Sequence, residues 1–189
     1  MDASDCYIET TVTYLEMFEQ PVRPSPAPPM GKHAILHAEH PTVSFYRYLY
    51  HTVGEPWTWT DRRILSDEAL CEIIHDPLVE IYVLHIGGVP AGFVELDRRI
   101  GNEVEMCFVG LMPEFTGRGL GNYMLDWAIH AAWSSKPTRV WLHTCDLDHP
   151  RALPLYQRAG FSAYKRQVEK VMSLEAVARI EAPSDGESG

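Results

Sequence analysis

The chain has 189 residues, enough for one domain with its own core, and 46% hydrophobic and 22% charged residues exclude a disordered, fibrous or membrane-spanning protein. Carboxylates outnumber Lys plus Arg by 26 to 16, and the net charge of -10 favours cationic ligands, so we expect no nucleic-acid and no membrane partner. The acidic N-terminus lacks a secretory signal and the four cysteines form no closely spaced pair, so we expect a cytoplasmic protein with reduced thiols.

The N-terminal part combines two strand-like runs with a connector. Residues 8–17 and 33–38 are rich in β-branched and apolar side chains, which predicts strands. Between them, residues 20–30 contain five prolines, so this segment can neither extend a sheet nor form a helix. We expect it to cross the surface as an extended connector.

The middle of the chain predicts two helices and then a meander. Apolar residues recur at helical spacing over 41–53, and Ser66 followed by two acids begins a second helix that stops at Asp76-Pro77. Glycine-containing turns then join three short extended segments, which predicts antiparallel strands at the centre of the sheet. These strands are expected at 80–86, 91–100 and 104–112.

The C-terminal part alternates helices and strands. The expected order is a long helix over 117–135, a strand over 139–145, a short helix within 150–159, a strand over 161–171 and a helical segment at 173–179. Pro154 would break a helix interior, so the short helix is expected to begin only at Leu153 or Pro154. The polar tail from Ala182 is expected to be disordered.

A strand that leads through a glycine-rich turn into a helix is the most informative segment. Glycines at 117, 119 and 121 let backbone N–H groups surround a diphosphate, and the helix N-terminus adds unpaired donors. The turn has no Gly-Lys-Ser/Thr ending, which excludes a P-loop, and Asn122 occupies the position of the last glycine of GxGxxG, which disfavours a Rossmann domain.

Two blocks resemble the GNAT superfamily of acetyl-CoA-dependent N-acetyltransferases. Thr116-Gly117-Arg118-Gly119-Leu120-Gly121 resembles its Gln/Arg-x-x-Gly-x-Gly/Ala motif with Thr116 in the first position, and residues 149–161 resemble Asn-x-x-Ala-x-x-Leu-Tyr-x-x-x-Gly-Phe with His149 for Asn. The resemblance covers roughly residues 42–171. It implies a mixed α/β fold, a mostly antiparallel twisted sheet flanked by helices. The expected divisions are an N-terminal extension (1–38), a catalytic domain (39–171) and a partly disordered tail (172–189).

The resemblance further implies acetyl transfer from acetyl-CoA to an amine. The strand over 104–112 would diverge from that over 139–145, and the pantetheine arm would lie in the opening. Backbone groups of Val109, Gly110 and Leu111 would pair with the arm, and one N–H could polarise the thioester carbonyl. The diphosphate would lie on the turn from Thr116 to Asn122. The cofactor-binding residues implied are Val109, Gly110, Leu111, Thr116, Gly117, Arg118, Gly119, Leu120, Gly121, Asn122 and His149.

An alkylammonium, with a pKa of about 10.4, must lose a proton before it can attack, so a base is needed. The family's glutamate position corresponds to Glu105, and strand alternation would put Glu103, Cys107 and Val109 on the same face; Glu103 and Glu95 are the rival bases. The family's tyrosine position corresponds to Tyr156, which would protonate the leaving thiolate. The structural alternative for Glu105 is a carboxylate on a solvated strand face. The alternative for Tyr156 is an aromatic residue that packs in the core.

Three further alternatives stay open. The loop that holds Trp57 and Trp59 either walls the amine or simply packs beneath a loop. A zinc site at His143, Cys145 and His149 matches no familiar spacing, and we expect no metal. A catalytically weak CoA-binding module is the rival function. The acceptor is expected to be an amine-bearing, cationic small molecule or exposed peptide amine, and the oligomeric state, a homodimer included, is left open. We also expect one of the two N-terminal strands to cover a sheet edge.

Overall fold

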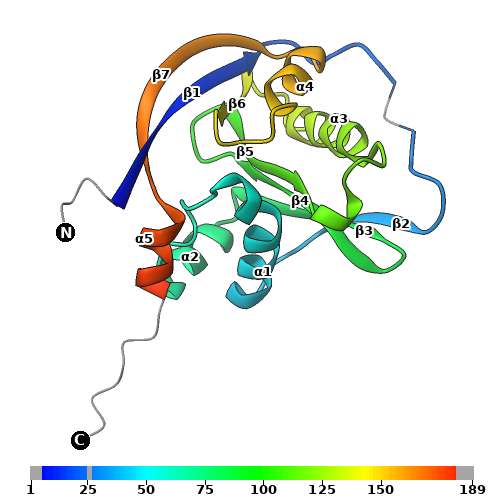
Figure 1. The fold of residues 1–189 in the computed structure, drawn as a ribbon. Helices are drawn as coiled ribbons and strands as arrows, with labels where there is room; N and C mark the ends of the chain where they lie inside the picture. Colours follow the sequence, from blue (N-terminus) through cyan, green and yellow to red (C-terminus); the bar gives the residue numbers. More distant parts are fainter. Residues whose placement is uncertain (1–5, 25–26, 182–189) are drawn as a thin grey trace, which may run out of the picture.

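A computed structural model describes residues 6–24 and 27–181 of the chain. One seven-stranded sheet has the order β2-β3-β4-β5-β6-β1-β7, and every neighbouring pair is antiparallel except β5 and β6 (Figure 1). The strands are β1 (Tyr7–Met17), β2 (His33–His37), β3 (Val79–Ile86), β4 (Val89–Asp97), β5 (Glu103–Leu111), β6 (Arg139–Cys145) and β7 (Ser162–Met172). The helices are α1 (Val43–Gly54), α2 (Asp67–Ile74), α3 (Leu120–Trp133), α4 (Ala152–Arg158) and α5 (Leu174–Glu181).

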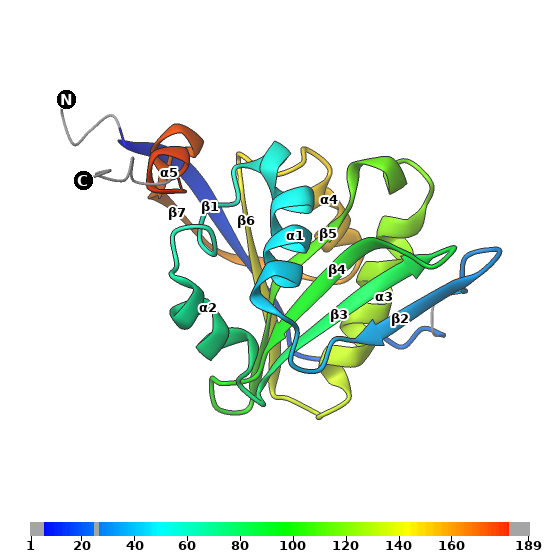
Figure 2. The same cartoon turned by 90° about the horizontal axis from the view of Figure 1, so that it is seen from below.

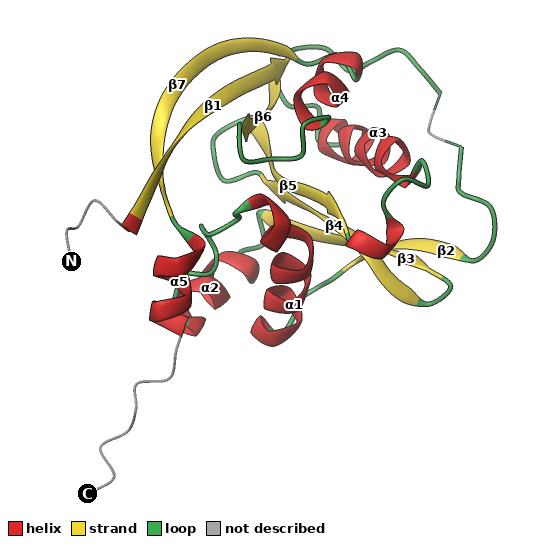
Figure 3. Ribbon diagram, in the orientation of Figure 1, coloured by secondary structure: helices red, strands yellow, loops and turns green. Residues whose placement is uncertain are grey.

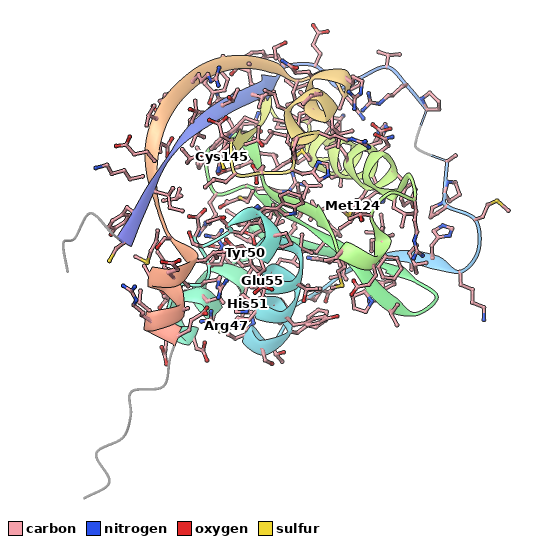
Figure 4. All side chains as sticks on the ribbon, in the orientation of Figure 1. Arg47, Tyr50, His51, Glu55, Met124 and Cys145 are labelled. Carbon is pink, nitrogen blue, oxygen red and sulfur yellow. The ribbon has the colours of Figure 1, made fainter. Side chains whose placement is uncertain are left out.

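Helices cover both faces of the sheet, so the mixed α/β fold expected from the sequence is confirmed (Figures 2 and 3). One core lies between α1, α2 and the sheet and includes the fully buried Tyr50 and Phe93. The other lies under α3 and includes Met124 and Leu96. Figure 4 labels Tyr50 on α1 and Met124 on α3, the helices of the two opposite layers.

The N-terminal strand is a structural part of the sheet. β1 pairs with β6 on one side and with β7 on the other, and Leu15 and Met17 are buried in the α3 core. β1 and β7 form a long curved pair that reaches from α4 towards α5 (Figure 1). An N-terminal strand was expected at a sheet edge, but β1 lies inside the sheet, because β7 pairs beyond it and is the edge strand on this side. β2 pairs with β3 at the opposite edge.

The parallel pair β5–β6 is short and then opens. Only Glu103, Val104 and Glu105 of β5 have partners in β6, whereas β5 stays paired with β4 as far as Leu111. The strands therefore diverge after Glu105, as the resemblance implied. Because both edges of this opening carry backbone groups, the fold presents hydrogen-bonding atoms to whatever lies between the strands.

A β-bulge changes the side-chain alternation in β5. Glu95 of β4 faces Phe108, but the next residue, Leu96, faces Met106, so Cys107 is an extra residue. Phe108 packs in the α1 core and Val109 against the α3 core. The expectation that Val109 shares a face with Glu105 is therefore wrong, because the bulge reverses the pattern.

Two predicted helix starts need correction. The long helix was expected from residue 117, but Gly117 and Gly119 have φ values of +72° and +78°, and α3 begins at Leu120. A left-handed residue cannot continue an α-helix, so the turn remains a loop. The short helix begins at Ala152 rather than at Leu153 or Pro154. Pro154 is its third residue, where the backbone N–H would have no partner within the helix.

The C-terminal helix fastens the chain end to the α1–α2 side. Ser173 caps α5, and Glu181 forms an ion pair with Arg63 at 2.6 Å. The tail from Ala182 lies outside the described residues. No helix in the described part of the chain combines the length and apolar character needed to cross a membrane.

The position of β1 predicts that it is essential for stability. Leu15→Ala should lower the free energy of unfolding by about 2–5 kcal/mol, since Leu15 is completely buried in the α3 core. Phe18→Ala, at a residue that is 62% exposed just beyond the strand, is the control and should change it by less than about 0.5 kcal/mol. Denaturant melts measure both, and equal stabilities would show that β1 contributes little.

Candidate acyl-transfer site

A cavity of about 500 Å³ follows the opening between β5 and β6. Its walls include β5 from Met106 to Leu111, and His143 and Cys145 of β6. Figure 4 shows Cys145 near the end of β6. The cavity extends from the glycine-rich turn before α3 to the loop after α1 and to β7, so the strand divergence determines where a ligand can enter the sheet.

The glycine-rich turn forms one end of the cavity. Thr116, Gly117, Gly119, Gly121 and Asn122 all line it. The left-handed conformations of Gly117 and Gly119 suit glycine, and no protein atom lies within 4 Å of a Cβ built at either position. The turn therefore leaves free space beside the N-terminus of α3, whose first N–H groups have no partner within the helix.

Not every residue of the predicted turn faces this space. Leu120 is buried in the core, and Arg118 lies over the Phe115 ring at 5.2 Å. Arg151 and Arg158, beside and within α4, line the cavity instead and form no ion pair with another described residue. Sequence reasoning missed these two arginines, although both stand inside the second motif block. They give the cavity wall positive charge in a chain of net charge -10.

His149 joins the cavity wall to the aromatic loop. Its Nδ1 accepts a hydrogen bond from the Arg151 backbone at 3.0 Å, and its ring lies 4.9 Å from the Trp57 ring. Trp57 lines the cavity as well. Trp59 packs against Tyr50 and donates from Nε1 to Asp148 at 3.1 Å. Both tryptophans therefore line the cavity, and Trp59 also packs against the α1 core. That these rings wall an amine stays a prediction.

Two acids, Asp61 and Glu169, line the cavity near His143 and are here called its acidic end. Asp61 lines it and is exposed, and no described residue bonds to its carboxylate. Its neighbour Arg62 is fixed by an ion pair with buried Glu95, at 2.6 Å. Glu169 of β7 also lines the cavity. Hydrogen bonds from Tyr14 and Gln167 lower the pKa of Glu169, so it stays ionised. Sequence reasoning missed both acids because the fold alone brings the loop and β7 together.

The three candidate bases have different surroundings. Glu95 is fully buried and accepts hydrogen bonds from Tyr46 and Arg62. Glu103 pairs with Arg139 at 2.7 Å. Both carboxylates thus have cationic partners. Glu105 instead lies 3.5 Å from the Nδ1 of His143. Its own side chain does not line the cavity, whereas the His143 ring does.

Tyr156 of α4 is half-buried and lines the cavity. Burial, with a smaller contribution from the charge of Asp148, raises the pKa of its hydroxyl, so it remains protonated at neutral pH. Burial likewise raises the pKa of Cys107 and of Cys145, and both cavity-lining residues stay neutral thiols. Tyr156 can therefore donate a proton or a hydrogen bond, while the thiols are poor nucleophiles. Among the described residues, no group of three or more His, Cys, Asp or Glu side chains is placed to hold a metal ion.

Comparison with known proteins agrees with this architecture. The model of the acetyltransferase (GNAT) family matches residues 43–161, well over half of the chain. The chain belongs to this family. The match contains the glycine-rich turn and most of the cavity walls described above.

Solved structures show the same fold at low sequence identity. A GCN5-related N-acetyltransferase from Sphaerobacter thermophilus has a TM-score of 0.65 and 16% identity, and the match covers 89% of this chain and 54% of that one. One from Kribbella flavida has a TM-score of 0.60 and 16% identity, with coverages of 90% and 61%. The ribosomal-protein-S18-alanine N-acetyltransferase from Escherichia coli has a TM-score of 0.58 and 14% identity, with coverages of 75% and 94%. The chain thus spans little more than half of the first two proteins. No curated protein matches it.

The glycine-rich turn yields a direct test. A ligand at a hundredfold excess over Kd stabilises the folded protein by about 2.7 kcal/mol, and we expect acetyl-CoA to do so in the wild type. Gly119→Leu should abolish most of this stabilisation. Gly87→Leu is a matched control in the β3–β4 turn, because Gly87 also has a positive φ (+62°) and free space around it. Both variants should lose basal stability, but Gly87→Leu should keep the full ligand shift. A full shift in Gly119→Leu would mean that the diphosphate does not bind at this turn.

Proposed function

We propose that the protein transfers the acetyl group of acetyl-CoA to a primary amine of a cationic small molecule or an exposed peptide. The observation that carries the proposal is the charge distribution along one continuous cavity. Arg151 and Arg158, which form no ion pair with another described residue, line the cavity together with the glycine-rich turn before α3, and Asp61 and Glu169 line it near His143. An anionic nucleotide and a cationic amine would be attracted to different parts of such a cavity. Family membership supports the same chemistry.

The reaction needs three contributions from the protein. Backbone groups on the open edge of β5, near Val109, Gly110 and Leu111, would hold the pantetheine arm and stabilise negative charge on the thioester oxygen. A base beside the acceptor would remove a proton from the ammonium, and Glu105 supplies negative charge next to His143, which lines the cavity. Tyr156 would protonate or hydrogen-bond the departing sulfur. The amine nitrogen forms the new C–N bond as the C–S bond breaks.

Turnover distinguishes this proposal from a CoA-binding module without efficient catalysis. Thiol release from acetyl-CoA should rise on addition of diamines and peptides with a free amine, and mass spectrometry should show the acceptor 42 Da heavier, the mass of an added acetyl group. Acetyl-CoA binding without amine-dependent thiol release for any acceptor in a broad panel would favour the binding module.

The hydroxyl of Tyr156 should matter for turnover and not for binding. Tyr156→Phe should lower kcat by about a hundredfold, the lower end of general-acid effects because a thiolate already leaves readily, and should leave the acetyl-CoA Kd unchanged. Tyr123→Phe on α3, outside the cavity, is the control and should leave both values unchanged. Wild-type kcat in Tyr156→Phe, measured where chemistry limits the rate, would assign Tyr156 to packing alone.

The acidic end should select acceptors that carry a second positive charge. Asp61→Asn should raise KM for a diamine up to about fivefold, since an exposed charge pair contributes up to roughly 1 kcal/mol. A monoamine of similar length should be affected less. Glu72→Gln removes one charge from the exposed face of α2, away from the cavity, and controls for net charge. Equal effects of Asp61→Asn on both acceptors would exclude Asp61 from acceptor selection.

A further inference from the structure

The base proposed from the sequence, Glu105, is not one of the residues that form the cavity walls. The Glu105 side chain is 16% exposed and does not line the cavity. The His143 side chain, on the neighbouring strand β6, is 38% exposed and lines the cavity wall. Because β5 and β6 diverge immediately after Glu105, that residue lies at the apex of the opening. His143, two residues beyond its partner Trp141 on β6, lines the cavity that an acceptor would enter.

We propose, resting on the function above, that His143 is the catalytic base that takes a proton from the ammonium, and that Glu105 is its positioning residue. The Glu105 carboxylate lies 3.5 Å from Nδ1, which favours the neutral tautomer with its proton on Nδ1 and its lone pair on Nε2. Nε2 makes no hydrogen bond to any described residue. The ring is also in contact with Tyr14 of β1, at a centroid distance of 5.7 Å. Tyr14 is itself fixed by a 2.6 Å hydrogen bond to Glu169.

The charges around His143 suit this role. Acids face it from four elements: Glu105 on β5, Asp61 in the loop after α1, Asp148 after β6, and Glu169 on β7. Burial alone would lower the pKa of His143, but the hydrogen bond and charge of Glu105, aided by Asp61 and Asp148, raise it overall. A raised pKa makes the neutral imidazole a stronger base towards the ammonium proton.

The proton balance is complete with groups already described. An ammonium and a thioester give an amide, a thiol and one free proton. The ammonium proton moves to Nε2 of His143 and from there to solvent through the exposed face of the ring. The sulfur takes a proton from the Tyr156 hydroxyl, and the second proton that the nitrogen loses returns through water to the Tyr156 oxygen, so the hydroxyl is restored. No metal, oxidant or reductant is required.

Removal of the imidazole gives the first arm of the test. With a diamine acceptor, His143→Gln should lower kcat/KM on the order of a hundredfold at pH 7 and should lose the acidic limb of the pH profile that reflects the base. Free imidazole should restore part of the activity in His143→Ala. His85→Ala on β3 is the control and should behave as the wild type. A His143→Gln enzyme with the wild-type pH profile would overturn the proposal.

The second arm of the test removes the negative charge of Glu105. Glu105→Gln should shift the acidic limb to lower pH, because the amide no longer raises the His143 pKa, and should respond little to imidazole. Complete loss of the limb in Glu105→Gln with its retention in His143→Gln would make Glu105 itself the base.

An NMR titration separates this proposal from the proposed function. The His143 ring signal, identified by its absence in His143→Gln, should titrate at a lower pH in Glu105→Gln than in the wild type whether or not the enzyme turns over. Absence of turnover with every amine would therefore refute the proposed function, whereas an unchanged titration would refute the pairing of Glu105 with His143.

Discussion

The divergence of β5 from β6 is the constraint on which the rest of the structure depends. The two strands pair over only three residues, so this contact alone would hold β6 weakly in the sheet. β1 stabilises β6, because it pairs along β6 and its residues Leu15 and Met17 are buried in the core beneath α3. A stable sheet can therefore keep a gap in its centre. The cavity, the glycine-rich turn and the acidic end are all arranged along that gap.

The same geometry explains how an acidic protein can hold an anionic cosubstrate. The overall charge of -10 would repel a nucleotide at long range, but Arg151 and Arg158 face the cavity and are not neutralised by described carboxylates. Most other arginines near the sheet are paired, as Arg62 is with Glu95 and Arg139 with Glu103. Unpaired cationic charge thus lines the same cavity as the glycine-rich turn, and the carboxylate of Asp61 is left for the acceptor.

The sequence predicted the parts of the fold that depend on local signals. Helical periodicity, the Ser66 cap and the glycine turns identified most elements within a few residues, and the two motif blocks identified the fold. It could not predict that β1 lies between β6 and β7, because long-range strand pairing has no local signal. The bulge at Cys107 was also missed, so Val109 was assigned to the wrong face. Glu105 could be proposed from spacing, but its neighbour His143 depends on the register of two strands that are far apart in sequence.

Hydrogen–deuterium exchange tests the central claim, that the opening between β5 and β6 receives acetyl-CoA, most directly. Amides between Met106 and Leu111 that have no partner in β4 face the opening and should exchange quickly in the free protein. Saturating acetyl-CoA should slow exchange in this segment and in the turn from Thr116 to Asn122, and a nucleotide that does not bind should leave both unchanged. If acetyl-CoA binds but slows amide exchange only in other segments, and exchange at Met106–Leu111 is unaltered, the claim that the opening receives acetyl-CoA is wrong.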